Sequence, residues 1–367
     1  MSLLRPVRKL ARIAEEFISA EPTGRRRKKY NPARPVQRPS PDGAIKLTRF
    51  SYDAYHLTEE SVSQEKAIQF PEQQVSWLNV DGVNKSLLET LAKHFKIHAL
   101  LIEDIQNVGQ RAKMDEIGNM VFCLLPMLYY NENTGMVECE QVSLVLVPGG
   151  VISFQEEAER DVFDPIRIRL RSGGSKLRTG TADFLLYTLL DVIVDSYFGI
   201  MERLDQRAER LEEEILQDRR GASAAKIALL RREILTVARA IAPVREVING
   251  LISCDSTLME NTNEKYYKDI LDHILHAMDN AESMRDGTTT LLELTFNQVN
   301  MRTNEIVKVF TIITTLLAPA TVIGGIFGMN FDIIPLAHQK DGFIIMVTLM
   351  FIIPLFMLIW FKRKNWF

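Results

Sequence analysis

The chain has 367 residues, of which 46% are hydrophobic and 25% are charged, and its net charge is −3. This composition excludes a mostly disordered protein and a protein that lies wholly within a membrane, and the small net charge argues against a polyanion binder. Three scattered cysteines are too few for a disulfide framework and are typical of a reduced, intracellular setting. We find no phosphate-binding loop, zinc motif or catalytic-serine motif, so the sequence does not predict an enzyme.

Residues 1–44 are predicted to form a disordered basic tail. The first 41 residues contain eleven Lys or Arg, three Glu and six prolines. Such a tail can contact anionic lipid, at about 1 kcal/mol for each basic residue near the surface, or it can stay solvated, and both alternatives are open. Nucleic-acid binding is not predicted, because no aromatic platform accompanies the charge. No signal peptide is visible.

Residues 45–180 are predicted to form a cytoplasmic α/β domain. Strand patterns, bounded by Gly, Pro and Asp, cover residues 74–80, 118–130, 141–147 and 151–155. Helical spacing covers residues 85–98. The sequence therefore predicts an α+β fold in which a mixed sheet packs with helices.

Residues 181–305 are predicted to be helical and cytoplasmic. An apolar stripe begins at Leu186, and we expect a turn at Gly221 and a returning helix over residues 223–251. A third helix is expected from Asn263 and continues as a long stalk into the first membrane span, over about 98 Å if unbroken. His273 and His276 are expected on a solvated face of this helix.

Residues 306–367 are predicted to form a transmembrane hairpin. Residues 309–327 and 342–361 carry no charge, and each run can cross about 30 Å of hydrocarbon. A pair of buried core helices is the alternative, but such helices are seldom apolar on all sides for so long. Arg302, Lys308 and the basic end of the chain place both termini in the cytoplasm, in a multi-pass protein of the inner or plasma membrane.

One face of the first span differs from the rest of that helix. Small or polar residues follow one another at steps of three and four along this face: Asn304, Val307, Thr311, Thr314, Ala318, Thr321, Gly325 and Gly328. A stripe of this kind has two interpretations. It can allow close packing between helices, or it can line a pore in which hydroxyl groups and backbone carbonyls face water.

The end of this span resembles a known family. Gly328-Met329-Asn330 at the external end of the first of two C-terminal spans is similar to the signature of the CorA-type magnesium/cobalt transporters. Further similar segments are LLIEDIQN at 100–107, FDPIR at 163–167, TNEIVKVFTII at 303–313 and the final KRKNWF. The resemblance implies a funnel-shaped homopentamer in a lipid bilayer, with the first span lining the pore. Related ZntB-like zinc transporters usually depart from Met in this tripeptide.

The resemblance implies a selectivity filter at Gly328, Met329 and Asn330. Because Mg²⁺ holds its waters tightly, uncharged amide and backbone oxygens can accept hydrogen bonds from a hydrated ion without trapping it. Asn304 is expected to form a second polar ring at the cytoplasmic end. Asp332, just outside the filter, is expected to attract cations.

The resemblance also implies a gate and a cytoplasmic Mg²⁺ sensor. Val307 and Phe310 are the expected apolar gate, whereas Ala318 is too small to constrict the pore. Carboxylates from adjacent subunits would repel one another until Mg²⁺ bridges them, which favours closure. The residues at the matching positions are Asp104 and Asp269, and the nearby acidic candidates are Glu103 and Asp191.

Two alternatives to magnesium transport are open. One is a ZntB-like zinc transporter, and the other is a membrane-anchored helical sensor or structural protein that conducts nothing. The sequence also leaves the order of preference among Mg²⁺, Co²⁺, Ni²⁺ and Zn²⁺ open, because a filter for hydrated ions separates these cations poorly.

Overall fold

The computed structural model describes residues 45–132, 134–156, 161–217, 224–329, 334–336, 339–364 and 366. The predicted basic tail, the turn at Gly221, the filter residue Asn330 and the neighbouring Asp332 lie outside these residues. The described residues up to Ile200, together with Thr236–Asp279, form one compact unit. Met201–Leu235 and the described residues from Asn280 onward form a second.

The first unit contains a seven-stranded mixed sheet. Its strands are β1 (Lys46–Tyr52), β2 (Leu57–Ser61), β3 (Val75–Asp81), β4 (Lys113–Glu116), β5 (Val121–Asn131), β6 (Met136–Val147) and β7 (Gly150–Gln155). Their order across the sheet is β2-β1-β3-β7-β6-β5-β4. β3 and β7 pair in parallel, and the other neighbours are antiparallel. The predicted mixed sheet is confirmed, although the patterns missed β1, β2 and β4.

A tight hairpin joins β6 to β7 and brings β7 beside β3. Gly149 has φ of +82°, which favours glycine. Gly150 pairs with Ser76 of β3, and a Cβ atom at Gly150 would collide with the Ser76 carbonyl. Glycine at this position therefore permits the parallel pairing at the centre of the sheet.

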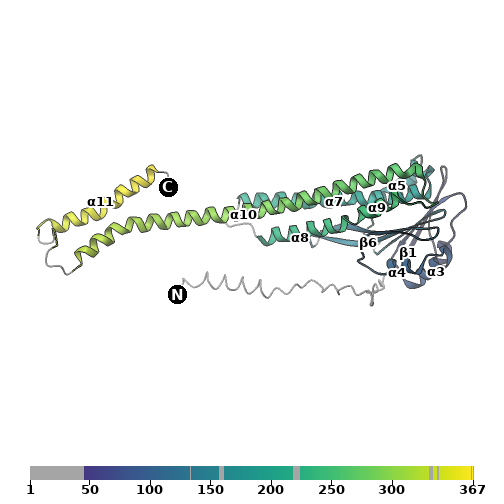
Figure 1. Ribbon diagram of the computed structural model, residues 1–367, viewed down its shortest axis with the longest axis horizontal. Helices are drawn as coiled ribbons and strands as arrows, with labels where there is room; N and C mark the ends of the chain where they lie inside the picture. Colours follow the sequence, from purple (N-terminus) through teal and green to yellow (C-terminus); the bar gives the residue numbers. More distant parts are fainter. Residues whose placement is uncertain are drawn as a thin grey trace. The chain divides into compact units, whose positions relative to one another are not determined.

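Short helices cover one face of the sheet (Figure 1). They are α2 (Gln64–Ala67), α3 (Lys85–Phe95) and α4 (Ala99–Gln106). The Asn84 side chain caps α3 by accepting a hydrogen bond from the Leu87 amide at 2.8 Å. Leu87 and Leu91 are buried in a hydrophobic cluster with Leu78 and Phe154 of the sheet. Leu101 and Ile105 of α4 are buried in the same cluster, which holds this helix and its two predicted sensor residues against the sheet.

The opposite face of the sheet packs against α5 (Asp164–Ser172), α6 (Lys176–Thr179), α9 (Val244–Ile252) and the first part of α7 (Ala182–Gln217) (Figure 1). Trp77 of β3 meets Phe163, the residue before α5, edge to face at 5.7 Å between ring centroids. The Tyr197 hydroxyl of α7 donates a hydrogen bond to the Pro126 carbonyl of β5 at 2.5 Å. The first contact holds the start of α5 against the sheet, and the second fixes the orientation of α7 about its own axis.

The helix predicted over residues 223–251 is divided in the structure. α8 (Ala224–Ile241) ends before a turn at Ala242-Pro243, and α9 begins at Val244. The prediction of one helix was wrong because Pro243 has no amide hydrogen to donate to the carbonyl four residues earlier. The remaining helices are a short 3₁₀ turn η2 (Asn261–Asn263), α10 (Glu264–Phe327) and α11 (Gly342–Arg363). The continuous stalk and first span are therefore confirmed as one helix, which retains Pro319 within it.

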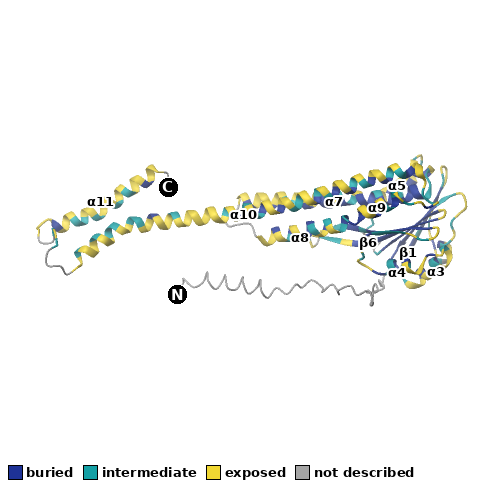
Figure 2. Ribbon diagram, in the orientation of Figure 1, coloured by how far each residue is buried: buried dark blue, intermediate teal, exposed yellow. Residues whose placement is uncertain are grey.

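Three helices of the described chain are long and apolar enough to cross a membrane. In α7 the apolar window is 67% buried inside the protein, so its apolar face belongs to the core. The corresponding windows are 6% buried in α10 and 11% buried in α11 (Figure 2). The two C-terminal helices thus expose the apolar surface that a bilayer covers.

Candidate functional site

Residues at the start of α10 and α7 are joined by a buried carboxylate. Asp183 is fully buried, and its Oδ2 accepts hydrogen bonds from Asn263 Nδ2 and from the Glu260 amide, each at 2.9 Å. The Tyr267 hydroxyl donates to the Asp183 backbone carbonyl at 2.8 Å. The start of the helix that carries the predicted pore is therefore held by directional bonds as well as by apolar packing.

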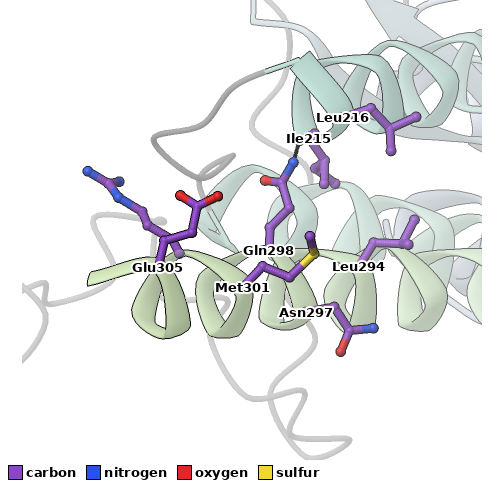
Figure 3. A pocket seen from close by; sticks show the side chains of 8 residues that line it. Ile215, Leu216, Leu294, Asn297, Gln298, Met301 and Glu305 are labelled. Carbon is purple, nitrogen blue, oxygen red and sulfur yellow. Dashed lines mark hydrogen bonds between the residues drawn. The ribbon is translucent and has the colours of Figure 1, made fainter. Parts of the chain in front are cut away.

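A groove of about 730 Å³ lies between the end of α7 and α10 in the second unit (Figure 3). Leu216, Leu294 and Met301 give it an apolar wall. The Gln298 side chain of α10 donates a hydrogen bond to the Ile215 carbonyl, as Figure 3 shows. Because the last carbonyls of a helix lack partners within the helix, this bond satisfies one of them and fastens the end of α7 to α10.

The predicted pore-lining stripe of α10 is exposed in the described chain. Its exposed residues are Asn304, Val307, Thr311, Thr314, Ala318 and Thr321, and the predicted gate residue Phe310 is also exposed. Burial in this part of α10 lies mainly on another face, where Ile312 is buried and Pro319 and Ile323 are half-buried. A Cβ atom on Gly324 would lie 3.5 Å from Met350 Cε of α11. At 3.6 residues per turn, the middle of the stripe lies about 140° around the helix axis from the face of Ile312, Pro319 and Ile323, and about 100° from Gly324.

The threonines of the stripe satisfy their hydrogens inside α10. Thr311 donates to the Val307 carbonyl at 2.8 Å, Thr314 donates to the Phe310 carbonyl at 2.9 Å, and Thr321 donates to the Leu317 carbonyl at 3.0 Å. Each hydroxyl oxygen keeps lone pairs that can accept a hydrogen bond from water. The stripe can therefore contact the water shell of a cation without offering it a charged ligand.

The C-terminal end of α10, with Gly328 and Met329 after it, is the described part of the predicted filter. The Gly328 amide donates to the Gly324 carbonyl at 3.0 Å, and the Met329 amide donates to the Ile326 carbonyl at 3.3 Å. The C-terminal end of a helix carries a partial negative charge on its last carbonyls. This end of α10 therefore attracts cations to the position where the tripeptide begins.

The predicted sensor residues on α4 have partners within the same protomer. Asp104 is largely buried, and its Oδ2 lies 2.5 Å from Lys113 Nζ of β4. Glu103 is exposed and accepts a hydrogen bond from Asn107 Nδ2 at 3.5 Å. A cation that binds to Asp104 must therefore compete with an ammonium group.

The other two predicted sensor residues lie on α7 and α10 and influence one another electrostatically. Asp269 is exposed, whereas Asp191 is half-buried. Burial raises the pKa of Asp191 to about 6, and the negative charges of Asp195 and Asp269 add to this increase, while His273 and Arg169 oppose it. The structure thus brings Asp191 and Asp269 into one acidic region.

Sequence reasoning missed two members of this region. Asp195 and His273 lie beside Asp191, and the ligand atoms of the three residues are within 4.8 Å of one another. The expectation of a solvated face is correct for the exposed His276, whereas His273 packs against Phe198 and still has a side chain that is 41% exposed. The available signal was the four-residue spacing of Asp191 and Asp195 on one helix and of Asp269 and His273 on another, which aligns each pair on one face.

The fold and this site define a membrane protein in which one continuous helix, α10, begins in an α/β unit and ends as one of two exposed, membrane-length helices. The family model described as "CorA-like Mg2+ transporter protein" matches residues 72–363, and the chain belongs to this family. Its sequence is 37% identical over 292 residues to the cobalt/magnesium transport protein CorA of Thermotoga maritima, covering 79% of this chain and 83% of that protein. It is 30% identical to the putative metal ion transporter YfjQ of Bacillus subtilis, covering 80% and 91% of the two chains.

Solved structures with low sequence identity share the fold. The complete structure of the CorA magnesium transporter from Methanocaldococcus jannaschii matches with a TM-score of 0.71 at 21% identity, covering 87% of this chain and 98% of that chain. The ZntB cytoplasmic domain from Vibrio parahaemolyticus matches with a TM-score of 0.56 at 13% identity, covering 70% and 100%. The expected combination of mixed sheet, long stalk helix and apolar helices is therefore confirmed.

Proposed function

We propose that this protein is a divalent-cation channel that conducts Mg²⁺, and also Co²⁺, into the cytoplasm down the electrochemical gradient. The observation that carries the proposal is the stripe from Asn304 to Gly328, which is small or polar, exposed, and on a different face of α10 from the buried Ile312. A helix that faced only lipid would gain nothing from such a stripe. The names of the Thermotoga maritima and Helicobacter pylori relatives, which cite cobalt and magnesium or magnesium transport, support the choice of cargo.

The proposed filter is Gly328-Met329-Asn330, with Asp332 attracting cations just outside it. Backbone and amide oxygens accept hydrogen bonds from the waters of Mg²⁺, which gives up its hydration shell reluctantly. The negative end of α10 adds to the attraction without a carboxylate ligand. A dication that enters the cell gains about 4.6 kcal/mol for each 100 mV of negative-inside potential, so no ATP site is required.

The proposed pore is formed by a homopentamer. The exposed stripe of one α10 needs neighbouring copies to enclose water, and the number five comes from the family resemblance. Val307 and Phe310 are both exposed at the cytoplasmic end of the stripe, where rings of apolar side chains would close the path by dewetting. Thr311, Thr314, Ala318 and Thr321 would line the path beyond this gate.

The proposed regulator is cytoplasmic Mg²⁺ bound between subunits. Asp104 and Glu103 on α4 would face Asp269 and Asp191 of a neighbouring copy, where a bound dication relieves the repulsion between carboxylates. Such a cation has higher affinity for the closed state and shifts the equilibrium toward it. Mg²⁺ would thus be both cargo and inhibitor.

The proposed topology places both termini in the cytoplasm and residues 328–341 outside, in the inner or plasma membrane. The proposed organisation comprises a basic tail (1–44), an α/β domain (45–180), a helical stalk region (181–305) and a transmembrane hairpin (306–367). The basic residues that flank both spans on one side support this orientation. The basic tail would lie near the cytoplasmic leaflet, within reach of anionic lipid.

Reconstitution into liposomes tests the proposal. Purified full-length protein should admit Mg²⁺ when an inward-negative potential is imposed, as reported by an internal Mg²⁺-sensitive dye. Vesicles that show no entry above protein-free controls would favour the alternative of a non-conducting sensor. Competition by Zn²⁺ at concentrations well below those of Mg²⁺ would instead favour a ZntB-like transporter.

A further inference from the structure

The groove shown in Figure 3 continues along α7 and α10 within the second unit. A second hollow, of about 310 Å³, lies between the same two helices. Leu294 lines both hollows, so they meet at this residue. We call the two together the furrow, which runs from Met284 to Glu305, about 32 Å along α10.

The α10 side of the furrow has the repeat of a helix-packing surface. The residues that line it recur in alternating steps of three and four: Met284, Gly287, Leu291, Leu294, Gln298, Met301 and Glu305. This repeat is typical of a surface against which a further helix packs at a small crossing angle. Leu216 and Met301 in the furrow are 64% and 67% exposed, so an occupant would remove apolar surface from water.

One end of the furrow is acidic. The charged residues that line the hollow next to Met284 are Asp205, Glu209 and Glu212, one in each turn of α7, and all three are exposed. At the other end, Arg302 and Glu305 have opposite charges. The furrow therefore suits a helix that is apolar along one face and basic in one half.

The sequence of residues 3–18, which lie outside the described residues, predicts such a helix. Its apolar residues recur in alternating steps of four and three: Leu3, Val7, Leu10, Ala14 and Phe17. Helical spacing places them on one face, and Pro6 falls in the first turn, where proline is tolerated. At 1.5 Å per residue, a helix over this segment is about 24 Å long and fits within the furrow.

The charges of the segment complement those of the furrow. Its first half is basic, and two acidic residues follow: Arg5, Arg8, Lys9 and Arg12, then Glu15 and Glu16. Because attraction between charges acts over about 8–10 Å at physiological salt, the basic residues need only lie near the acidic side of the furrow. An isolated helix of this length is marginal in water, so the segment would fold as it docks.

Two further observations favour this segment over other occupants. The 26 residues that join it to β1, 19–44, can reach about 90 Å, and such a tether raises the local concentration of the segment at the furrow. A second copy fits less well, because the furrow residues from Leu294 to Glu305 lie on average about 150° around the axis of α10 from the middle of the stripe. Copies that enclose the stripe would therefore meet on another face, a step that rests on the proposed function.

We propose that residues 3–18 bind as a helix in the furrow of the same chain, with their basic half beside Asp205, Glu209 and Glu212. Docking would fasten the end of α7 to α10 directly before the proposed membrane span, and would leave the basic residues 25–29 to contact anionic lipid. Docking does not require conduction. A failed flux assay would therefore leave this proposal standing, and a failed docking assay would leave the proposed channel standing.

The test is hydrogen exchange followed by mass spectrometry, on the full-length protein in nanodiscs of phosphatidylcholine. The backbone amides of residues 7–18 should exchange more slowly than those of an unstructured chain, by roughly tenfold or more. Leu216→Asp places a charge in the apolar part of the furrow and should abolish this protection. Gln217→Asp is the matched control, because it adds the same charge at the next exposed position of α7, outside the furrow, and it should retain the protection.

A second variant tests the segment itself. Leu10→Asp, on the predicted apolar face, should also abolish the protection, while circular dichroism shows that all three variants melt as the wild type does. Protection should not require phosphatidylglycerol in the nanodiscs. Protection that appears only with this anionic lipid, or that persists in Leu216→Asp, would show that another surface holds the segment and would overturn the proposal. Unprotected amides in the wild type, or an equal loss in Gln217→Asp, would overturn it as well.

Discussion

Asn263 donates a hydrogen bond from Nδ2 to Oδ2 of Asp183 at 2.9 Å, and this bond joins the residue directly before α10 to the start of α7. Both residues are buried, and the same carboxylate oxygen accepts the Glu260 amide. The long helix is thus anchored at its α/β end by a charged acceptor with several donors. A charged acceptor makes such bonds stronger than neutral ones.

Asp183→Ala should lower the free energy of unfolding by roughly 2–3 kcal/mol, because it leaves buried donors without an acceptor. Chemical denaturation followed by circular dichroism measures the loss. Glu202→Ala, at an exposed position further along α7, is the control and should change little. Equal stability of the two variants would show that packing alone holds the start of α10.

Asn330→Ala should abolish selective Mg²⁺ flux while leaving the oligomer intact, because it removes the amide oxygens that would contact the hydrated ion. Flux into liposomes and size-exclusion chromatography with light scattering measure the two properties. Gln339→Ala, in the same connection between α10 and α11, should conduct normally. Normal uptake by the Asn330 variant would remove this residue from the filter.

Val307→Ser should increase resting Mg²⁺ entry, because a hydroxyl at a narrow apolar ring favours water in the gate. Ile313→Ser is the control, since Ile313 is also exposed but lies outside the stripe. Liposome flux with Mg²⁺ on the cytoplasmic side compares them. If both variants conduct at the wild-type rate, Val307 does not close the path; Phe310→Ser then tests the neighbouring candidate.

Asp269→Asn should raise the internal Mg²⁺ concentration needed for closure, because it removes one carboxylate from the proposed regulatory site. Flux at stepped internal Mg²⁺ concentrations gives the inhibition curve. Asp272→Asn is the matched control, an exposed carboxylate one turn further along α10. An inhibition curve that coincides with the wild type would count against a sensor at Asp269.

Asp81→Asn should make stability less dependent on pH. Burial raises the pKa of Asp81; the charge of Asp161 adds to the increase, and hydrogen bonds from Gln155 and Asn79 oppose it. The folded state therefore binds this proton more tightly than the unfolded chain, and stability falls as pH rises from about 3.9, the ordinary Asp value, through the raised pKa.

The Asp81 variant should consequently melt at a higher temperature than the wild type near neutral pH, with the difference shrinking toward pH 4. The asparagine oxygen can still accept the bond that Asn79 Nδ2 donates at 2.9 Å. Melting temperatures over a pH series test this, with the exposed Glu72→Gln as control. A variant that is less stable than the wild type at every pH would contradict it.

Patterns in the sequence predicted the elements whose apolar residues are continuous or periodic. β3, β7, α10 and α11 are of this kind, because each must bury or expose an apolar surface along its whole length. β2 and β4 were not predicted, since their LTEES and KMDE sequences are polar and they join the sheet at its two edges through backbone pairing. Pro243 marks a possible break, but its missing amide hydrogen alone does not predict one, because Pro319 lies inside the continuous α10.

The candidate site also contains residues that the sequence alone predicts and residues that it does not. The stripe from Asn304 to Thr321 follows from helical periodicity alone, whereas the assignment of Asn330 depends on the family resemblance. The neighbours of Asp191 could not be predicted, because the approach of Asp195 to His273 depends on how α7 and α10 are rotated about their axes when they pack. Likewise, Lys113 begins β4, and no pattern in the sequence pairs it with Asp104.

The ion pair between Lys113 and Asp104 has a consequence for the proposed sensor. The Lys113 ammonium group is only nine residues from Asp104 in the chain. It is therefore always available to compete with Mg²⁺ for the Asp104 carboxylate. Incoming Mg²⁺ has to displace it, so the sensor would ignore trace amounts of metal and respond only above a threshold. The length and charge of one lysine side chain would therefore tune the Mg²⁺ level at which the cell stops importing.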